Sequence, residues 1–339
     1  MLKTDLTIII PWFSQSDWTS LIFSSLKKEA DRKKIKFNLI IGECIGKKKK
    51  VQKNEPFSFL YPKLKVVEKI IEFSHKNILA DRIVIIDSSF VNMKAIRYIA
   101  GDNKKVSCFV NGGFFQDYDL DRQTILGYQN ELLKFEEGHY SLMDNIFLPS
   151  KYAFKIFLKK YPSLKHKCFY NYYDLEDNFN KKGRFSEKRG YLFASRESFE
   201  KGADIVWKLI KSGLKIDSII GLENKVFRKK LSGFKALLVP SRADLFGFCA
   251  LESIFAGTIP IVPNGFSYEE LILIPGYLKL SLPIGDKTLK EIKNIIKIID
   301  EIPEETYKKI IIGARKHLLS KMSDKNHNFL AAVRKIFYE

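Results

Sequence analysis

Cysteines are few in this sequence and lie far apart. The 339 residues include four cysteines and five histidines, and no two cysteines are separated by only two residues. This spacing argues against a zinc ribbon and against a disulfide scaffold. Cys108 and Cys249 lie in apolar or helix-forming runs. We therefore expect both to be buried thiols, and we expect a reducing, cytoplasmic compartment.

The sequence also lacks a long hydrophobic run. No stretch approaches the ~20 apolar residues that cross a bilayer, and the apolar run Leu6–Ile10 is too short for the core of a signal peptide. We expect a protein that is soluble or attached peripherally to the inner membrane surface. The hydrophobic fraction of 45% allows one large domain or two of ordinary size.

Acidic side chains are scarce relative to basic ones. The chain has 58 Lys and Arg against 39 Asp and Glu, which gives a net charge of +19. The excess is spread over both halves, with 29 basic and 21 acidic residues in 1–180 and 29 and 18 in 181–339. Two explanations stay open: a lysine-rich proteome, or a polyanionic partner such as nucleic acid, an anionic membrane or an anionic substrate.

Short apolar runs alternate with helical patterns along the chain, which predicts parallel sheets covered by helices on both faces. The predicted strands are Leu6–Ile10, Phe37–Ile41, Arg82–Ile86, Val106–Val110, Gly190–Ala194, Ser218–Ile220, Ala236–Val239 and Ile259–Val262. The predicted helices are 18–34, 201–211, 248–256, 287–302, 304–316 and 326–337. Residues 171–189 are polar and aperiodic, so we interpret them as a linker between two domains.

The strongest chemical signal is the segment PSRADLFGFCALE, residues 240–252. It begins where a predicted strand ends, and Gly247 opens a predicted helix. The N-terminus of a helix presents backbone N–H groups and the positive end of its dipole, which suits a diphosphate. Glu252, inside this helix, can accept hydrogen bonds from a ribose diol, and Asp244 on the loop can do the same for sugar hydroxyls.

This segment resembles the E-x7-E region of retaining glycosyltransferases with the GT-B fold, particularly the GT4-like group. The wording of that group is P-S-x-x-E-x-F-G-x-x-x-L-E. The matching positions are Pro240, Ser241, Phe246, Gly247, Leu251 and Glu252. The first acid is Asp244 instead of Glu, one methylene shorter. The resemblance implies that Phe246, Gly247 and Phe248 also belong to the donor site.

A second segment supports the first. FASRESFEKGAD, residues 193–204, resembles the family stretch G-R-x-x-x-x-K-G-x-D, with Ser195 in place of the first Gly. The resemblance implies that Arg196 and Lys201 hold the donor diphosphate. The leaving nucleoside diphosphate gains negative charge as the glycosidic bond breaks. Fixed cations at that place stabilise the transition state more than the ground state.

A third segment, residues 144–174, resembles the end of the family's N-terminal domain. The resemblance covers residues 144–265 well and the rest in outline. It implies a GT-B fold of class α/β, in which two Rossmann-like domains with parallel sheets face each other across a cleft. The expected domains are 1–172 on the acceptor side, 185–318 for the nucleotide sugar, and a C-terminal helix in 319–339 that crosses back to the first domain.

The chain departs from the family pattern in its first half. The family often has Gly-Gly after the first strand, where this chain has PWFSQSD, so Ser14 is an acceptor-side candidate. Many members place a His after the fourth strand, where this chain offers Asn111 and Asp117. We keep both as catalytic candidates, although Asp117 and Asp119 can equally be acidic loop residues.

The stretch between Ile220 and Pro240 is short for this family. The turn Gly221–Glu223 within it also resembles, more loosely, the bacteriophage DNA α-glucosyltransferases, and it makes Glu223 a donor-site candidate. A lysine run follows the second predicted strand, at the rim of the expected acceptor side. It is either a solvated loop or a contact for an anionic acceptor, and it comprises Lys47, Lys48, Lys49, Lys50 and Lys53.

The resemblance implies an enzyme that transfers a sugar from a nucleoside diphosphate donor with retention of configuration. We expect no metal and no other cofactor, because Arg196, Lys201 and the helix end at Gly247 take the place of the ion. The leading acceptor is a surface glycan or lipid. Two alternatives stay open: a modified base in DNA or RNA, and a non-catalytic binding module on the same fold.

Overall fold

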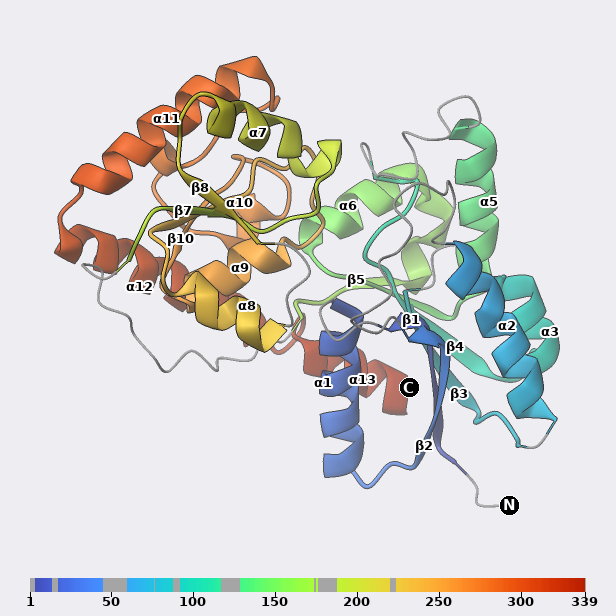
Figure 1. Ribbon diagram of the computed structural model, residues 1–339. Helices are drawn as coiled ribbons and strands as arrows, with labels where there is room; N and C mark the ends of the chain where they lie inside the picture. Colours follow the sequence, from blue (N-terminus) through green and yellow to red (C-terminus); the bar gives the residue numbers. More distant parts are fainter. Residues whose placement is uncertain are drawn as a thin grey trace. The chain divides into compact units, whose positions relative to one another are not determined.

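The computed structural model describes residues 4–13, 18–44, 60–75, 77–87, 92–116, 129–173, 175, 188–219 and 224–338 (Figure 1). The described chain divides into two compact units. Unit 1 contains the residues up to Gln116, residues 129–173 and the residues from Lys325 onward, and unit 2 contains residues 175 to Asp324. The C-terminal segment thus belongs to unit 1, although it follows unit 2 in the sequence.

Unit 1 is built on a six-stranded parallel sheet with the strand order β2-β1-β3-β4-β5-β6. Its strands are β1 (Leu6–Phe13), β2 (Phe37–Cys44), β3 (Arg82–Ile86), β4 (Lys105–Phe109), β5 (Asn145–Leu148) and β6 (Cys168–Tyr170). The consecutive isoleucines of β1, Ile8 to Ile10, are all fully buried, so both faces of this central strand are covered.

Helices flank this sheet. They are α1 (Trp18–Arg32), α2 (Leu60–Ser74), α3 (Met93–Ala100), α5 (Gln129–Ser141), α6 (Lys151–Lys160), the 3-10 helix η2 (Pro162–Lys167) and α13 (Phe329–Tyr338). Side-chain caps fix two of the helix starts, because Asn92 accepts from the backbone N–H of Ala95 and Ser150 from that of Ala153. The described helices include none with the length and apolar content needed to span a bilayer.

Unit 2 is built on a four-stranded parallel sheet with the order β10-β9-β7-β8. Its strands are β7 (Tyr191–Phe193), β8 (Ile216–Ser218), β9 (Ala236–Leu238) and β10 (Ile259–Ile261). Its helices are η4 (Phe199–Lys201), α7 (Ala203–Lys211), α8 (Asn224–Leu231), α9 (Phe248–Phe255), α10 (Tyr268–Leu271), η5 (Gly276–Leu278), α11 (Asp286–Glu301) and α12 (Glu304–Met322). Figure 1 shows α7 and α11 side by side, and the two helices pack together.

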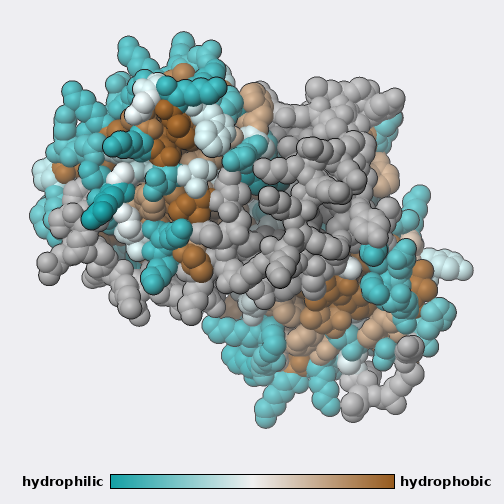
Figure 2. Space-filling view, in the orientation of Figure 1, coloured by the Kyte–Doolittle hydropathy of each residue, from teal (hydrophilic) through white to brown (hydrophobic). Residues whose placement is uncertain are grey.

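The α/β class with two parallel sheets is confirmed, and the bounds of several predicted elements are wrong. β1 and β2 each continue three residues past their predicted ends, to Phe13 and Cys44, and α13 begins at Phe329, three residues after its predicted start. The strand expected at Ser218–Ile220 is β8, which lies two residues earlier and pairs Ile216 with Tyr191. The helix expected to end at residue 316 continues as α12 to Met322, because its buried stripe continues through Leu318. On the face shown in Figure 2, hydrophilic side chains cover much of the described surface and hydrophobic ones form separate patches.

Candidate functional site

Two loops of unit 2 leave neighbouring strands at the point where the strand order reverses. β8 pairs with one edge of β7, and the next strand in the sequence, β9, pairs with the other edge. The order in which strands are added to the sheet therefore reverses between β7 and β9. The loop 194–201 follows β7, and the loop 239–247 follows β9. In open parallel sheets, ligands bind at such a switch point, beyond the carboxyl ends of the strands.

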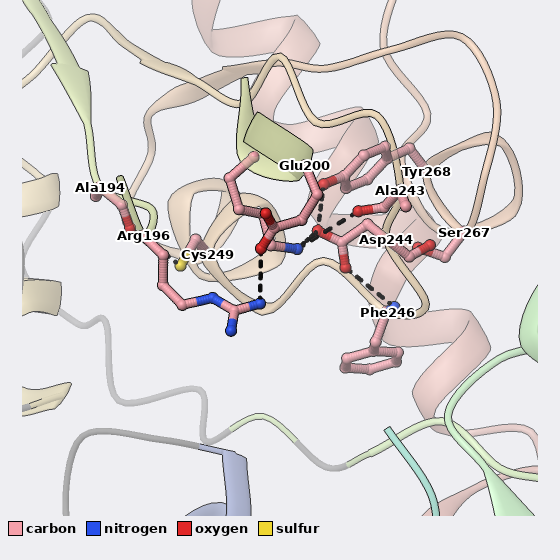
Figure 3. A network of polar contacts seen from close by, with 10 residues as sticks. Ala194, Arg196, Glu200, Ala243, Asp244, Phe246, Cys249, Ser267 and Tyr268 are labelled. Carbon is pink, nitrogen blue, oxygen red and sulfur yellow. Dashed lines mark hydrogen bonds and ion pairs between the residues drawn. The ribbon is translucent and has the colours of Figure 1, made fainter. Parts of the chain in front are cut away.

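Lys201 and Asp244 meet where these two loops approach each other (Figure 3). The Nζ atom of Lys201 lies 3.1 Å from Oδ2 of Asp244 and 3.4 Å from the backbone oxygen of Ala243. The two side chains are 20% and 16% exposed. A charge-assisted contact in this partly dry environment is stronger than one on an open surface. The structure therefore brings together two of the predicted site residues.

Tyr268, which the sequence analysis did not single out, completes this contact. Its hydroxyl donates to Oδ2 of Asp244 at 2.8 Å, and the backbone N–H of Phe246 approaches Oδ1 at 3.4 Å. The Tyr268 ring is fully buried. Burial raises the pKa of its phenol well above the usual range, and the charge of Asp244 raises it further. Tyr268 is thus a permanent hydrogen-bond donor to Asp244.

Gly247 sits directly against Tyr268 and begins helix α9. Its φ of +80° lies in the left-handed region, and a Cβ atom there would approach Cε1 of Tyr268 to 2.3 Å. Only glycine satisfies both demands without strain. Gly247 adds no side-chain cap to α9, and the backbone N–H groups in the first turn of a helix have no partner within the helix.

Arg196, the other predicted cation, lies in the loop after β7. Its side chain is 64% exposed, and its NH2 atom lies 3.0 Å from Oε1 of Glu200, whose side chain is only 4% exposed. In Figure 3 the guanidinium of Arg196 faces Glu200 with one edge, and Asp244 lies beyond that carboxylate. Both predicted cations are therefore paired with carboxylates of the same unit.

Arg242 locks the two loops together. Its guanidinium binds both oxygens of Asp204, at 2.7 and 2.9 Å, and lies 3.7 Å from the centre of the Phe199 ring. Its backbone N–H donates to the backbone oxygen of Glu200 at 2.7 Å. Arg242 and Asp204 stand inside the two sequence motifs, so the motifs contained a signal for this pair. The pair was missed because only Asp204 is specified in the family wording, while Arg242 occupies an unspecified position.

Glu252 lies in α9 and is paired with Arg228 of α8. Nε of Arg228 donates to Oε1 of Glu252 at 2.9 Å, and both side chains are nearly buried. Burial raises the pKa of the Glu252 carboxyl, and the positive charge of Arg228 opposes this shift. Arg228 was not among the residues predicted from the sequence. The expected contact of Glu252 with a ribose stays a prediction.

The remaining donor-site candidates lie around this centre. Phe246 is buried, and its ring meets that of the half-buried Phe248 edge to face at 4.8 Å between centroids. Ser195 is half-buried at the end of β7. Of the two thiols expected to be buried, Cys108 is buried and Cys249 is only half-buried. Sγ of Cys249 lies 3.5 Å from the backbone oxygen of Ala194, and burial raises its pKa to about 12.

In unit 1, Asn111 follows the carboxyl end of β4, and its buried Oδ1 makes no hydrogen bond to a described residue. Glu136 holds the segment that follows Asn111. It accepts hydrogen bonds from the backbone N–H groups of Phe114 and Phe115, each at 3.1 Å, and from the hydroxyl of Tyr161. The other predicted residues lie outside the described part of the chain: Ser14, Lys47, Lys48, Lys49, Lys50, Lys53, Asp117 and Glu223.

No family model and no curated protein matches this sequence. Many solved structures share its fold, among them the following three. Sucrose-phosphate synthase from Thermosynechococcus elongatus matches with a TM-score of 0.72 at 11% identity over 98% of this chain and 97% of its own. Anabaena HepE with UDP-glucose bound matches with 0.64 at 12% identity over 98% of both chains.

TarM of S. aureus, solved as a point mutant with fondaparinux, alpha-GlcNAc-glycerol and UDP, matches with a TM-score of 0.60 at 11% identity over 81% of this chain. The matched region spans 59% of the TarM chain. These likenesses agree with the two parallel α/β units described above, and the fold of this chain is the GT-B fold of glycosyltransferases.

Proposed function

We propose that this chain is a glycosyltransferase that uses a nucleoside diphosphate sugar and retains the configuration of the transferred sugar. The contact of Lys201 with Asp244 at the switch point of unit 2 carries the proposal. A cation, a carboxylate and the N-terminus of α9 are brought together there by two segments, the loop after β7 and the loop that runs from β9 into α9. HepE and TarM, which share the fold, were solved with UDP-glucose and with UDP.

In this proposal the diphosphate binds between the cations and the first turn of α9. The bond from the sugar to the diphosphate breaks, and the leaving oxygen gains negative charge. Lys201, Arg196 and the dipole of α9 stabilise that charge. These groups replace a divalent metal in neutralising the diphosphate, so the reaction is proposed to need no metal. Asp244 is proposed to contact the hydroxyls of the donor sugar.

The proposed acceptor is a surface glycan or lipid, and the proposed place of action is the cytoplasm or the inner membrane surface. TarM was solved with alpha-GlcNAc-glycerol, a sugar joined to a small polyol. A second candidate acceptor is a modified base in DNA or RNA, and the net charge of +19 favours it. The third alternative, a binding module without catalysis, differs from both in that it does not turn over a donor.

The test begins with a thermal-shift screen of nucleoside diphosphates and their sugars. A ligand present at 100 times its dissociation constant adds about 2.7 kcal/mol to the stability. Donor turnover is then measured for Lys201→Ala and for a control, Lys211→Ala, an exposed lysine at the end of α7. We expect Lys201→Ala to lose about 1.5–3 kcal/mol of transition-state stabilisation, roughly ten- to a hundredfold in rate.

Wild-type turnover in Lys201→Ala would remove this residue from the donor site. The anomeric configuration of the product, followed by NMR, tests retention, and full activity after treatment with a chelator tests the absence of a metal. Binding of a donor with no transfer to water or to any acceptor would favour the binding module.

A further inference from the structure

Glu200 is a buried carboxylate next to the two proposed phosphate-binding cations. Its side chain is 4% exposed, and neither carboxylate oxygen accepts a hydrogen bond from a described residue. Its backbone is held by the N–H of Arg242 and by the 3-10 helix η4. The backbone of Glu200 is therefore held in place and its side chain is enclosed. Among the described residues, the counter-charge of the carboxylate is Arg196, at 3.0 Å from NH2 to Oε1.

The two partners of this ion pair are placed very differently. Arg196 is 64% exposed and sits on an irregular loop, whereas Glu200 is enclosed. An exposed arginine is normally free to sample many rotamers. A buried carboxylate that lost its counter-charge would be costly. Glu200 therefore anchors Arg196 through NH2 and leaves the rest of the exposed guanidinium available to a ligand.

The neighbouring ion pair of Lys201 and Asp244 differs from that of Arg196 and Glu200, because its carboxylate has a second partner. Asp244 keeps a hydrogen bond from Tyr268 when Lys201 is engaged elsewhere, at 2.8 Å. No such second contact from the described residues supports Glu200. Lys201 can consequently turn toward a ligand without leaving Asp244 unpartnered, whereas Arg196 is tied to its carboxylate.

We propose that Glu200 is a positioning residue, which holds the guanidinium of Arg196 where the diphosphate of the donor binds. This inference rests on the proposed function, and it assigns to Glu200 no contact with the substrate. Because the arginine is ordered before the ligand arrives, binding loses less side-chain entropy. If Glu200 instead competes with the diphosphate for Arg196, then replacing Glu200 should strengthen the binding of pyrophosphate and not weaken it.

The variants are Glu200→Gln, Arg196→Ala and the double variant, with Asp286→Asn as control. Asp286 forms an exposed ion pair with Lys208 in the same unit, at 2.8 Å, outside the two site loops. Binding of UDP and of inorganic pyrophosphate is measured by calorimetry, together with kcat and KM for donor turnover. We expect Glu200→Gln to weaken pyrophosphate binding about 2- to 12-fold, the cost of ordering one side chain, and to leave kcat less affected than KM.

In the Arg196→Ala background the same substitution should have no further effect, since Glu200 acts only through Arg196. Tighter binding in Glu200→Gln would overturn the proposal in favour of competition, and an equal loss in both backgrounds would show a role without Arg196. Thermal unfolding reports whether each variant folds. If Glu200→Gln does not, Glu200→Met, which fills a similar volume without charge, takes its place.

A further measurement needs no ligand. The 15N relaxation of the Arg196 Nε group should show a restricted side chain in the wild type and a mobile one in Glu200→Gln. Unchanged relaxation would refute the anchoring itself. Restricted Arg196 in a wild-type protein that binds neither pyrophosphate nor any nucleotide would leave the anchoring intact and overturn the proposed function.

Discussion

Tyr268 donates a hydrogen bond of 2.8 Å to Asp244 through Oδ2, the same oxygen that lies 3.1 Å from Nζ of Lys201. The glycosyltransferases that the motif resembles have the longer Glu at this position. Here the shorter carboxylate is engaged on one side by a buried phenol and on the other by a lysine. The replacement of the family's Glu by Asp244 is thus accompanied by two contacts, from Tyr268 and from Lys201, which hold the shorter side chain in place.

We predict that Tyr268→Phe lowers donor turnover while the protein remains folded. The substitution keeps the ring against Gly247 and removes one hydrogen bond to a carboxylate, which is worth about 1.5–3 kcal/mol. The measurement is kcat/KM with the donor found in the screen. Tyr307→Phe is the control, because this buried hydroxyl donates to the backbone oxygens of Lys235 and Gly257 instead of to a carboxylate of the site. Equal loss of turnover in both variants would point to a general effect of destabilisation.

We predict that Gly247→Ala lowers the melting temperature far more than Gly190→Ala does, because it disrupts the start of α9. Both glycines have positive φ, +80° and +53°. A Cβ at 247 would lie 2.3 Å from the Tyr268 ring, whereas a Cβ at 190 would meet no atom within 4 Å. Gly190→Ala therefore measures the backbone strain alone, about 1 kcal/mol or somewhat more. Comparable melting temperatures in the two variants would contradict the packing described for Gly247 and Tyr268.

Much of the fold was open to prediction because buried parallel strands consist of continuous apolar residues. Arg82–Ile86 was predicted from such a run and is observed with the same bounds as β3. Strand β8 was misplaced because it is an edge strand in which only Ile216 is buried, while Asp217 and Ser218 are exposed. Its apolar signal was weaker than that of the neighbouring pair Ile219 and Ile220.

Some residues of the candidate site could likewise be predicted from the sequence, and others could not. Lys201 and Asp244 could be named because each lies in a motif next to a strand end. Tyr268 and Arg228 could not, since each reaches its carboxylate across 24 residues of sequence through the packing of α10 or α8. No local periodicity encodes such a contact. Glu200 was passed over because a glutamate next to a lysine is typical of an exposed surface, and only the fold shows that it is enclosed.

A buried lysine outside the site gives a prediction about pH. Nζ of Lys188 donates to the backbone oxygen of Ser232 at 2.7 Å, and burial lowers the pKa of Lys188 to about 8 from 10.5. Between these pH values the unfolded chain binds more protons than the folded chain, so the contribution of Lys188 to stability rises as the pH increases. Below pH 8 the cost of burying the charge is fully present.

We expect Lys188→Met to remove this dependence. The free energy of unfolding of the wild type, relative to that of the variant, should increase between about pH 7.5 and about pH 10. The total increase is at most about 1.4 kcal/mol for each unit by which the pKa of Lys188 differs between the folded and the unfolded chain. Chemical denaturation of both proteins at the two pH values gives the comparison, and groups that titrate in both cancel. The variant also loses the bond to Ser232, so the absolute stabilities are not informative. Parallel pH profiles would show that Lys188 titrates normally in the folded state.

The last prediction distinguishes the acceptor classes and concerns the lysine run of residues 47–50 together with Lys53, which lies outside the described residues. A nucleic-acid acceptor requires several phosphates to be neutralised, and each contact releases a condensed counterion. The logarithm of the affinity for duplex DNA should then fall with the logarithm of the salt concentration, with a slope of about −0.9 per phosphate.

Replacing the five lysines with Gln should flatten that slope by several units if they contact the acceptor. Donor binding should not change, because the proposed donor site lies in unit 2. A neutral glycan acceptor would show almost no salt dependence, and the replacement would then be silent. An anionic membrane is also sensitive to salt, so vesicles with anionic lipid and duplex DNA are compared in parallel. Weak binding to both, independent of salt, would leave the charge of +19 as a general lysine bias and would remove the polyanionic acceptor.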